Sequence, residues 1–184
     1  MKRRLLVIMV LIALAVGGRR YWAYWREHRF DTEIMAAGKR YGIDPALVKA
    51  IIWRESNFDP WVTGKAGEIG LMQLLKPAAL EWASAEHLQG FTHQDCFQPG
   101  TNILAGTWYL SRMLKHYARA DDPVPYALAD YNAGHTHAVT WQQGAAGTNS
   151  DRFITQIGFP STQRYVLAIL SRRELYRREM KEPD

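Results

Sequence analysis

A glutamate near the end of a predicted helix, Glu55, has the position in this sequence that best suits acid–base chemistry. The helix begins at Asp44 and Pro45, which are typical of an N-cap and a first helical residue. Val48 and Ile51 lie on one apolar face, and Glu55 takes the next position on it. Burial and the helix dipole would both raise the pKa of this carboxyl, as a general acid near neutral pH requires. The helix alone leaves open the alternative that Glu55 turns outward into solvent.

The composition is that of one globular domain with a short appendage. The chain has 184 residues and a net charge of +5, but Lys2, Arg3 and Arg4 supply most of the excess. Without them the net charge is only about +2, so charge does not indicate a nucleic-acid partner. Cys96 is the single cysteine, which excludes an intramolecular disulfide.

The first residues resemble an export signal. The three basic residues precede an apolar run at residues 5–16, and residues 19–25 are basic and aromatic. We interpret residues 1–18 as a signal peptide or an N-terminal membrane anchor, and residues 19–30 as a linker. The remaining chain is then expected outside the cytoplasm, in the periplasm or cell envelope. The sequence leaves open whether the segment is removed or associates with the inner membrane.

Residues 31–184 are predicted to form one mainly helical domain. Helical periodicity is clearest at residues 27–42, 45–56, 101–118 and 162–180, with shorter helices at 125–131 and 152–159. Between the helix of Glu55 and the next one, the pairs Asp59-Pro60, Thr63-Gly64 and Ala66-Gly67 are typical of turns. We therefore expect a loop-rich or small-sheet insert after the helix of Glu55.

Four short motifs occur in a fixed order along this domain. Glu55-Ser56 is followed by the sequence GLMQ at residues 70–73, YNAG at residues 131–134, and Tyr165-Val166. Together they resemble the soluble lytic transglycosylase (SLT) domain family of the lysozyme-like superfamily, over roughly residues 34–170. Asn102 and Gly106 lie in a helix that the family places between the second and third motifs. The resemblance implies a mainly α, lysozyme-like α+β fold.

The resemblance also implies an activity on peptidoglycan glycan strands, with no cofactor. The β-1,4 bond between N-acetylmuramic acid and N-acetylglucosamine would be cleaved without water, which leaves a 1,6-anhydromuramyl end. Ordinary glycosidases use two carboxylates, whereas Glu55 has no obvious partner here and would act as the sole acid and base. Two alternatives stay open: a hydrolytic muramidase, in which Asp130 beside the third motif would be the second carboxylate, and a non-catalytic peptidoglycan-binding component.

The residues carried over from the family motifs are expected to surround the acid. Gln73 and Asn132 offer both donors and acceptors for amino sugars. The hydroxyl of Tyr131 is expected to orient Glu55, whereas Tyr165 would line the cleft wall or pack in the core. The full set of expected substrate-binding residues is Ser56, Gly70, Met72, Gln73, Tyr131, Asn132 and Tyr165. Ser56 would support the fold around the acid, Gly70 would permit close approach of the ligand, and Met72 would contact a sugar or belong to the core.

The sequence departs from the family pattern at two informative positions. A serine that often contacts the N-acetyl group is replaced by Gly64, and an alanine before YNAG is replaced by Asp130. His135 and His137 follow that motif, but no third ligand follows in a fitting pattern. We interpret them as solvated side chains and expect no metal site.

Overall fold

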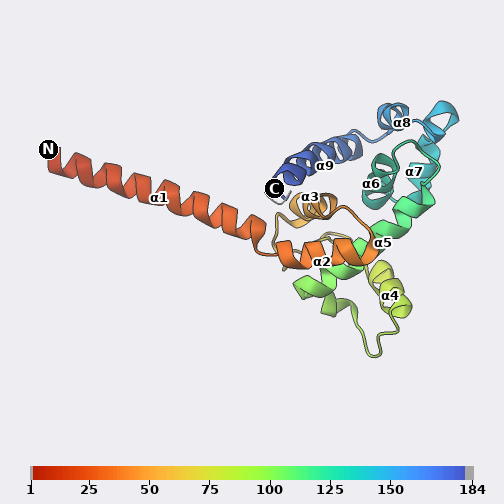
Figure 1. The fold of residues 1–184 in the computed structure, drawn as a ribbon, viewed down its shortest axis with the longest axis horizontal. Helices are drawn as coiled ribbons and strands as arrows, with labels where there is room; N and C mark the ends of the chain where they lie inside the picture. Colours follow the sequence, from red (N-terminus) through yellow and green to blue (C-terminus); the bar gives the residue numbers. More distant parts are fainter. Residues whose placement is uncertain (1, 181–184) are drawn as a thin grey trace.

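A computed structural model describes residues 2–180, and Figure 1 shows their arrangement. Within these residues the secondary structure is almost entirely helical. The elements in chain order are α1 (Lys2–His28), α2 (Asp31–Tyr41), α3 (Pro45–Ser56), α4 (Lys76–Ala85), η1 (His93–Phe97), α5 (Pro99–His116), α6 (Val124–Ala133), α7 (His135–Trp141), η2 (Gly144–Gly147), α8 (Ser150–Gln156) and α9 (Pro160–Glu179). The prediction of a mainly α domain is confirmed.

Helix α3 is the central element of the domain. Its carboxylate N-cap, Asp44, accepts a hydrogen bond of 3.0 Å from the amide of Ala46, as the sequence predicts. Most of its side chains are buried, and α9 and α2 pack against it. The helix ends at two successive left-handed residues, Asn57 (φ 49°) and Phe58 (φ 63°). Glu55 thus lies in the last turn of a largely buried helix.

The insert between α3 and α4 contains little regular sheet. Within the described residues, its β pairing consists of isolated bridges between Thr63 and Ile69 and between Ile69 and Leu74. Gly70, between the bridges, has φ 77°, a conformation that glycine adopts without strain. The insert is therefore a set of tight turns that returns the chain to the end of α3.

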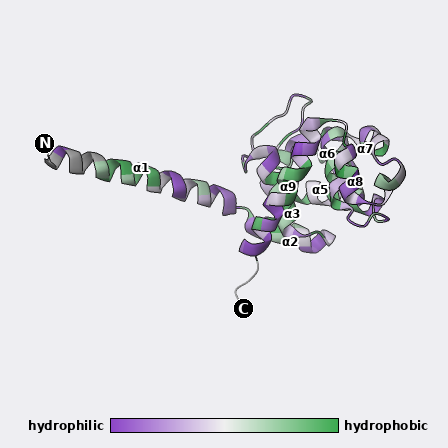
Figure 2. Cartoon of the chain, turned by 90° about the horizontal axis from the view of Figure 1, so that it is seen from above, coloured by the Kyte–Doolittle hydropathy of each residue, from purple (hydrophilic) through white to green (hydrophobic). Residues whose placement is uncertain are grey.

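Helix α1 projects from the domain as a long rod (Figure 1). Residues 19–28, which were expected to be part of a linker, continue this helix. Figure 2 shows hydrophobic residues along its middle part and hydrophilic residues toward the domain. The side chains from residue 9 to residue 25 are exposed all around it. Judged over the described residues, no helix is both long and apolar enough to span a membrane.

Candidate active site

A cleft of about 420 Å³ lies beside the end of α3. Its walls come from the insert, α4, α5, α6 and the start of α7. The polar residues that line it are Glu55, Glu68, Gln73, Tyr109, Asp130, Tyr131, Asn132 and His135. The fold thus brings together residues of the first three motifs, which lie far apart in the chain.

The carboxyl group of Glu55 is the partly buried acid of this cleft. The hydroxyl of Tyr165, on α9, donates a hydrogen bond of 2.5 Å to its Oε1 atom. Burial raises the pKa of Glu55, and the negative charge of Glu68 adds to this. The hydrogen bond from Tyr165 and the charge of Arg54 lower the pKa, but the net shift is upward. Glu55 therefore keeps its proton to a higher pH than an ordinary glutamate does.

The two tyrosines of the motifs have roles that differ from the expected ones. The hydroxyl of Tyr131 donates to the carbonyl oxygen of Met72 at 2.7 Å, and it does not orient Glu55. The residue that contacts the acid is Tyr165, which the sequence placed in the cleft wall or core. Both tyrosine rings are well enclosed, and burial raises the pKa of each hydroxyl well above its usual range. Each therefore stays protonated and acts as a donor.

Gln73 and Asn132 present polar atoms to the cleft, but each is also held by the fold. Gln73 has a left-handed backbone (φ 47°), and its amide donates to the carbonyl oxygens of Val62 at 3.0 Å and Gly70 at 2.8 Å. The Oδ1 atom of Asn132 accepts from the hydroxyl of Thr162 at 2.8 Å. These bonds leave the carbonyl oxygen of Gln73 and the amide of Asn132 to meet a ligand.

The other three residues that were expected to bind substrate do not line the cleft. Met72 is fully buried, so it belongs to the core, one of the two alternatives. Gly70 does permit a close approach, but to protein: a Cβ atom there would lie 2.3 Å from the amide nitrogen of Asn102. The hydroxyl of Ser56 donates to the carbonyl of Ile52 at 3.1 Å, within α3. These residues shape the cleft without lining it.

The glycine at position 64, one of the departures from the family pattern, is explained by the position of the Glu68 side chain. The carboxylate of Glu68 folds back to accept from the amide of Ala66 at 2.9 Å. A Cβ atom at position 64 would lie 2.2 Å from its Oε2 atom. The space that a serine side chain would take is thus filled by a cleft-lining carboxylate, which sequence motifs gave no reason to single out.

Asp130, the other departure, is engaged in a buried network. Its Oδ2 atom accepts from the hydroxyl of Tyr117 at 2.7 Å and contacts the Nδ1 atom of His135 at 2.8 Å. The hydrogen bond to Asp130 contributes to a raised pKa of Tyr117, after burial. His137 instead packs its ring against Trp141. Across the described residues, no group of three potential ligands is arranged to hold a metal ion.

Two substitutions are expected to move the pKa of Glu55 in opposite directions. Tyr165→Phe removes the donor that favours the charged form, so the pKa should rise further. Glu68→Gln removes a neighbouring negative charge, so the pKa should fall. NMR titration of the Glu55 carboxyl carbon measures both. Shifts of the same sign, or none, would contradict this description of the site.

Comparisons with known proteins agree with this geometry. The sequence profile of the Transglycosylase SLT domain matches residues 32–154. The membrane-bound lytic murein transglycosylase F of Desulfosudis oleivorans is 35% identical over 156 residues, which cover 83% of this chain and 31% of that protein. The soluble lytic murein transglycosylase of Escherichia coli K12 is 30% identical over 157 residues, or 82% of this chain and 24% of that protein.

Solved structures show the same likeness. An inactive glutamate-to-glutamine mutant of lytic transglycosylase Slt from Pseudomonas aeruginosa aligns with a TM-score of 0.75 and 26% identity, over 83% of this chain and 24% of that one. A complex of the 70-kDa soluble lytic transglycosylase with bulgecin A also gives 0.75 and 26%, over 84% and 25%. The chain spans about a quarter to a third of the length of these relatives. Because the profile covers more than half of its residues, the chain belongs to the transglycosylase SLT domain family.

Proposed function

We propose that this protein is a peptidoglycan lytic transglycosylase. It would cleave the β-1,4 bond between N-acetylmuramic acid and N-acetylglucosamine and leave a 1,6-anhydromuramyl end. The observation that carries the proposal is the Glu55–Tyr165 pair, a carboxyl with a raised pKa that faces a cleft. The relatives are lytic murein transglycosylases, and one of them is inactive as a glutamate-to-glutamine mutant.

A single carboxyl can serve both halves of this reaction. Protonated Glu55 donates its proton to the glycosidic oxygen as the bond from that oxygen to C1 of the muramyl residue breaks. The 6-hydroxyl oxygen of the same sugar then bonds to C1, and its proton passes to the Glu55 carboxylate. No water enters, and Glu55 ends in its starting form. Tyr165 stabilises the charged carboxylate between the two proton transfers through its hydrogen bond.

The polar atoms of the cleft suit an amino-sugar polymer. The free carbonyl oxygen of Gln73 can accept a hydrogen bond from an acetamido N–H. The free amide of Asn132 can donate to a hydroxyl or an acetyl carbonyl. Tyr131 lines the cleft while its hydroxyl is occupied, so it would offer its ring to an apolar sugar face. We assign these three residues to substrate binding, and Ser56, Gly70 and Met72 to the support of the cleft.

Hydrolysis of the same bond is the second candidate, because Glu68 and Asp130 both line the cleft with Glu55. A hydrolase needs one of them to activate a water molecule. The Oδ2 atom of Asp130 is already engaged by Tyr117 and His135, and Glu68 bonds to the backbone of its own loop. These contacts favour the non-hydrolytic route. A non-catalytic binding component is disfavoured because Glu55 and its donor are both in place.

Mass spectrometry of the products distinguishes the three functions. Purified glycan strands are digested in water enriched in ¹⁸O. We expect anhydromuramyl ends without ¹⁸O. Reducing muramyl ends that carry ¹⁸O would establish the muramidase instead, and intact strands that stay bound to the protein would establish the binding component.

We also propose that the protein is exported to the cell envelope and associates with a membrane through its N-terminal helix. The apolar side chains at residues 9–16 are exposed on every side of α1, which fits a surrounding lipid phase better than a one-sided protein groove. Arg19 and Arg20, followed by exposed Tyr21 and Trp22, suit the interface with phospholipid headgroups. N-terminal sequencing of the protein from membrane and soluble fractions tests whether this segment is retained.

A further inference from the structure

The turn that follows Glu55 is held in an unfavourable conformation. Asn57 and Phe58 both have positive φ angles, 49° and 63°. Asparagine tolerates the left-handed region, but a bulky residue such as phenylalanine rarely enters it without compensation. The ring of Phe58 is 1% exposed and fixed in the core. Contacts from other parts of the chain must therefore stabilise this turn, which lies two to three residues beyond the proposed catalytic acid.

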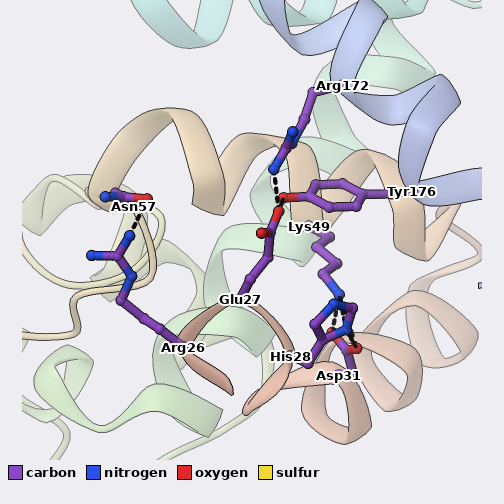
Figure 3. Close-up of polar contacts among 8 residues, drawn as sticks. All are labelled: Arg26, Glu27, His28, Asp31, Lys49, Asn57, Arg172 and Tyr176. Atoms are coloured by element: carbon purple, nitrogen blue, oxygen red, sulfur yellow. Dashed lines mark hydrogen bonds and ion pairs between the residues drawn. The ribbon is translucent and has the colours of Figure 1, made fainter. Parts of the chain in front are cut away.

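Two arginines at the junction of α1 and α2 contact this turn. The guanidinium of Arg26 donates to the side-chain oxygen of Asn57 at 3.2 Å (Figure 3). The guanidinium of Arg29 donates to the carbonyl oxygen of Phe58, and it stacks over the rings of Trp25 and Phe30, at 5.1 and 4.6 Å from their centroids. Each of the two left-handed residues thus accepts a hydrogen bond from its own arginine.

Glu27, which lies between the two arginines in the sequence, contacts α9, the helix that carries Tyr165. Glu27 accepts hydrogen bonds from both Arg172 and Tyr176 (Figure 3). Burial raises the pKa of Glu27, but the hydrogen bond from Tyr176 and the charge of Arg172 together outweigh it, so the net shift is downward. Glu27 is therefore ionised at neutral pH and ties the end of α1 to α9.

A third contact joins the same junction to α3 itself. The ammonium group of Lys49 is fully buried and lies 2.6 Å from Oδ1 of Asp31, at the start of α2. It also lies 3.1 Å from Nδ1 of His28, the last residue of α1 (Figure 3). A buried ammonium without its carboxylate would be strongly destabilising, so this pair fixes the junction on the central helix.

We propose that residues 26–29 form a clamp that positions the Glu55–Tyr165 pair. Arg26 and Arg29 hold the turn at the end of α3, and Glu27 holds α9. The clamp therefore fixes the relative positions of α3, which carries Glu55, and α9, which carries Tyr165. This inference rests on the proposed function. The clamp residues are positioning residues, because none of them lines the cleft.

The test compares Arg29→Met, just after α1, with Arg20→Met, a matched change at an exposed arginine within α1. In detergent and on purified glycan strands, we expect Arg29→Met to lower kcat by about tenfold while KM stays within about twofold. A loosened turn admits water to Glu55, so the pKa of its carboxyl should fall toward the ordinary value. Arg20→Met should match the wild type, and Arg29→Lys, which retains a donor, should recover most of the lost activity.

An unchanged kcat and an unchanged Glu55 titration in a folded Arg29→Met protein would overturn the clamp. If that variant does not fold, Arg26→Met is compared in the wild type and in an Asn57→Gly background. Glycine adopts the left-handed conformation unaided, so the loss caused by Arg26→Met should shrink there, and an equal loss would also overturn the proposal. The NMR titration of Glu55 reports on the clamp even if the wild type does not cut strands, which would refute the proposed function alone.

Discussion

The Glu55→Gln variant is expected to lose strand cleavage almost completely. Removal of a general acid–base group lowers rates by roughly 10²- to 10⁴-fold, and here the same group serves both proton transfers, so we expect the upper part of that range. Glutamine has nearly the same shape, and its amide oxygen can still accept from Tyr165. The cleft should therefore keep its form and its affinity for strands. Release of anhydromuropeptides measures the rate, and co-sedimentation with glycan strands measures binding.

The same variant makes a prediction about stability and pH. Since the folded state raises the pKa of Glu55, the protonated form stabilises the fold, and that contribution is lost as pH rises through the folded-state value. Neutral glutamine carries no such pH dependence. Near pH 7 the variant should therefore be at least as stable as the wild type, and its advantage should vanish below the ordinary pKa of a glutamate. Urea denaturation at several pH values measures this.

Glu81→Gln is the matched control for this experiment, since Glu81 pairs with Arg112 on the surface and lies outside the cleft. It should cut strands at the wild-type rate. A Glu55→Gln protein that keeps more than about a tenth of the wild-type rate would exclude Glu55 as the general acid.

The helical fold was predictable from sequence because periodicity and capping residues act locally. Asp44 and Pro45 set the start of α3, and Gly42 ends α2 in the left-handed conformation (φ 69°) that glycine favours. The end of α3 was less predictable. Asn57 tolerates the left-handed region, but Phe58 carries no local signal for it. The contacts that hold this turn come from residues 26 and 29, far away in the sequence. Residues 19–28, which the sequence analysis assigned to a linker, continue α1.

The position of Glu55 at the cleft was predictable, but the identity of its hydrogen-bond partner was not. Glu55 follows from helix spacing together with the motifs. The choice between Tyr131 and Tyr165 depends on how α6 and α9 pack around α3, and that packing is a tertiary property. Glu68 was passed over for a similar reason, since the position of its carboxylate depends on how the turn folds back and on the space left by Gly64.

Asn102→Ala is expected to have the largest effect on stability. Asn102 lies on α5 and is fully buried. Its Oδ1 atom accepts from the amide of Met72 at 2.7 Å, and its Nδ2 atom donates to the carbonyl oxygens of Ile69 at 3.0 Å and Cys96 at 2.8 Å. Alanine leaves the amide of Met72 and the carbonyl oxygen of Cys96 without these partners, at about 1–3 kcal/mol each, partly offset by relaxation. The carbonyl oxygen of Ile69 keeps its hydrogen bond from the amide of Leu74. We expect the free energy of unfolding to fall by about 2–4 kcal/mol.

The substitution should also disturb the cleft, because two of the three bonds, those to Met72 and Ile69, fix the insert that carries Gln73. Strand cleavage by the folded fraction should therefore fall together with stability. Thr107→Val, on the same helix, is the matched control. The hydroxyl of Thr107 is buried and has no hydrogen-bond partner among the described residues, so its removal should leave stability unchanged or raise it by about 1 kcal/mol. Equal destabilisation of the two variants in urea would show that any substitution of a buried α5 residue has this effect. Asn102 would then have no special role in anchoring the insert.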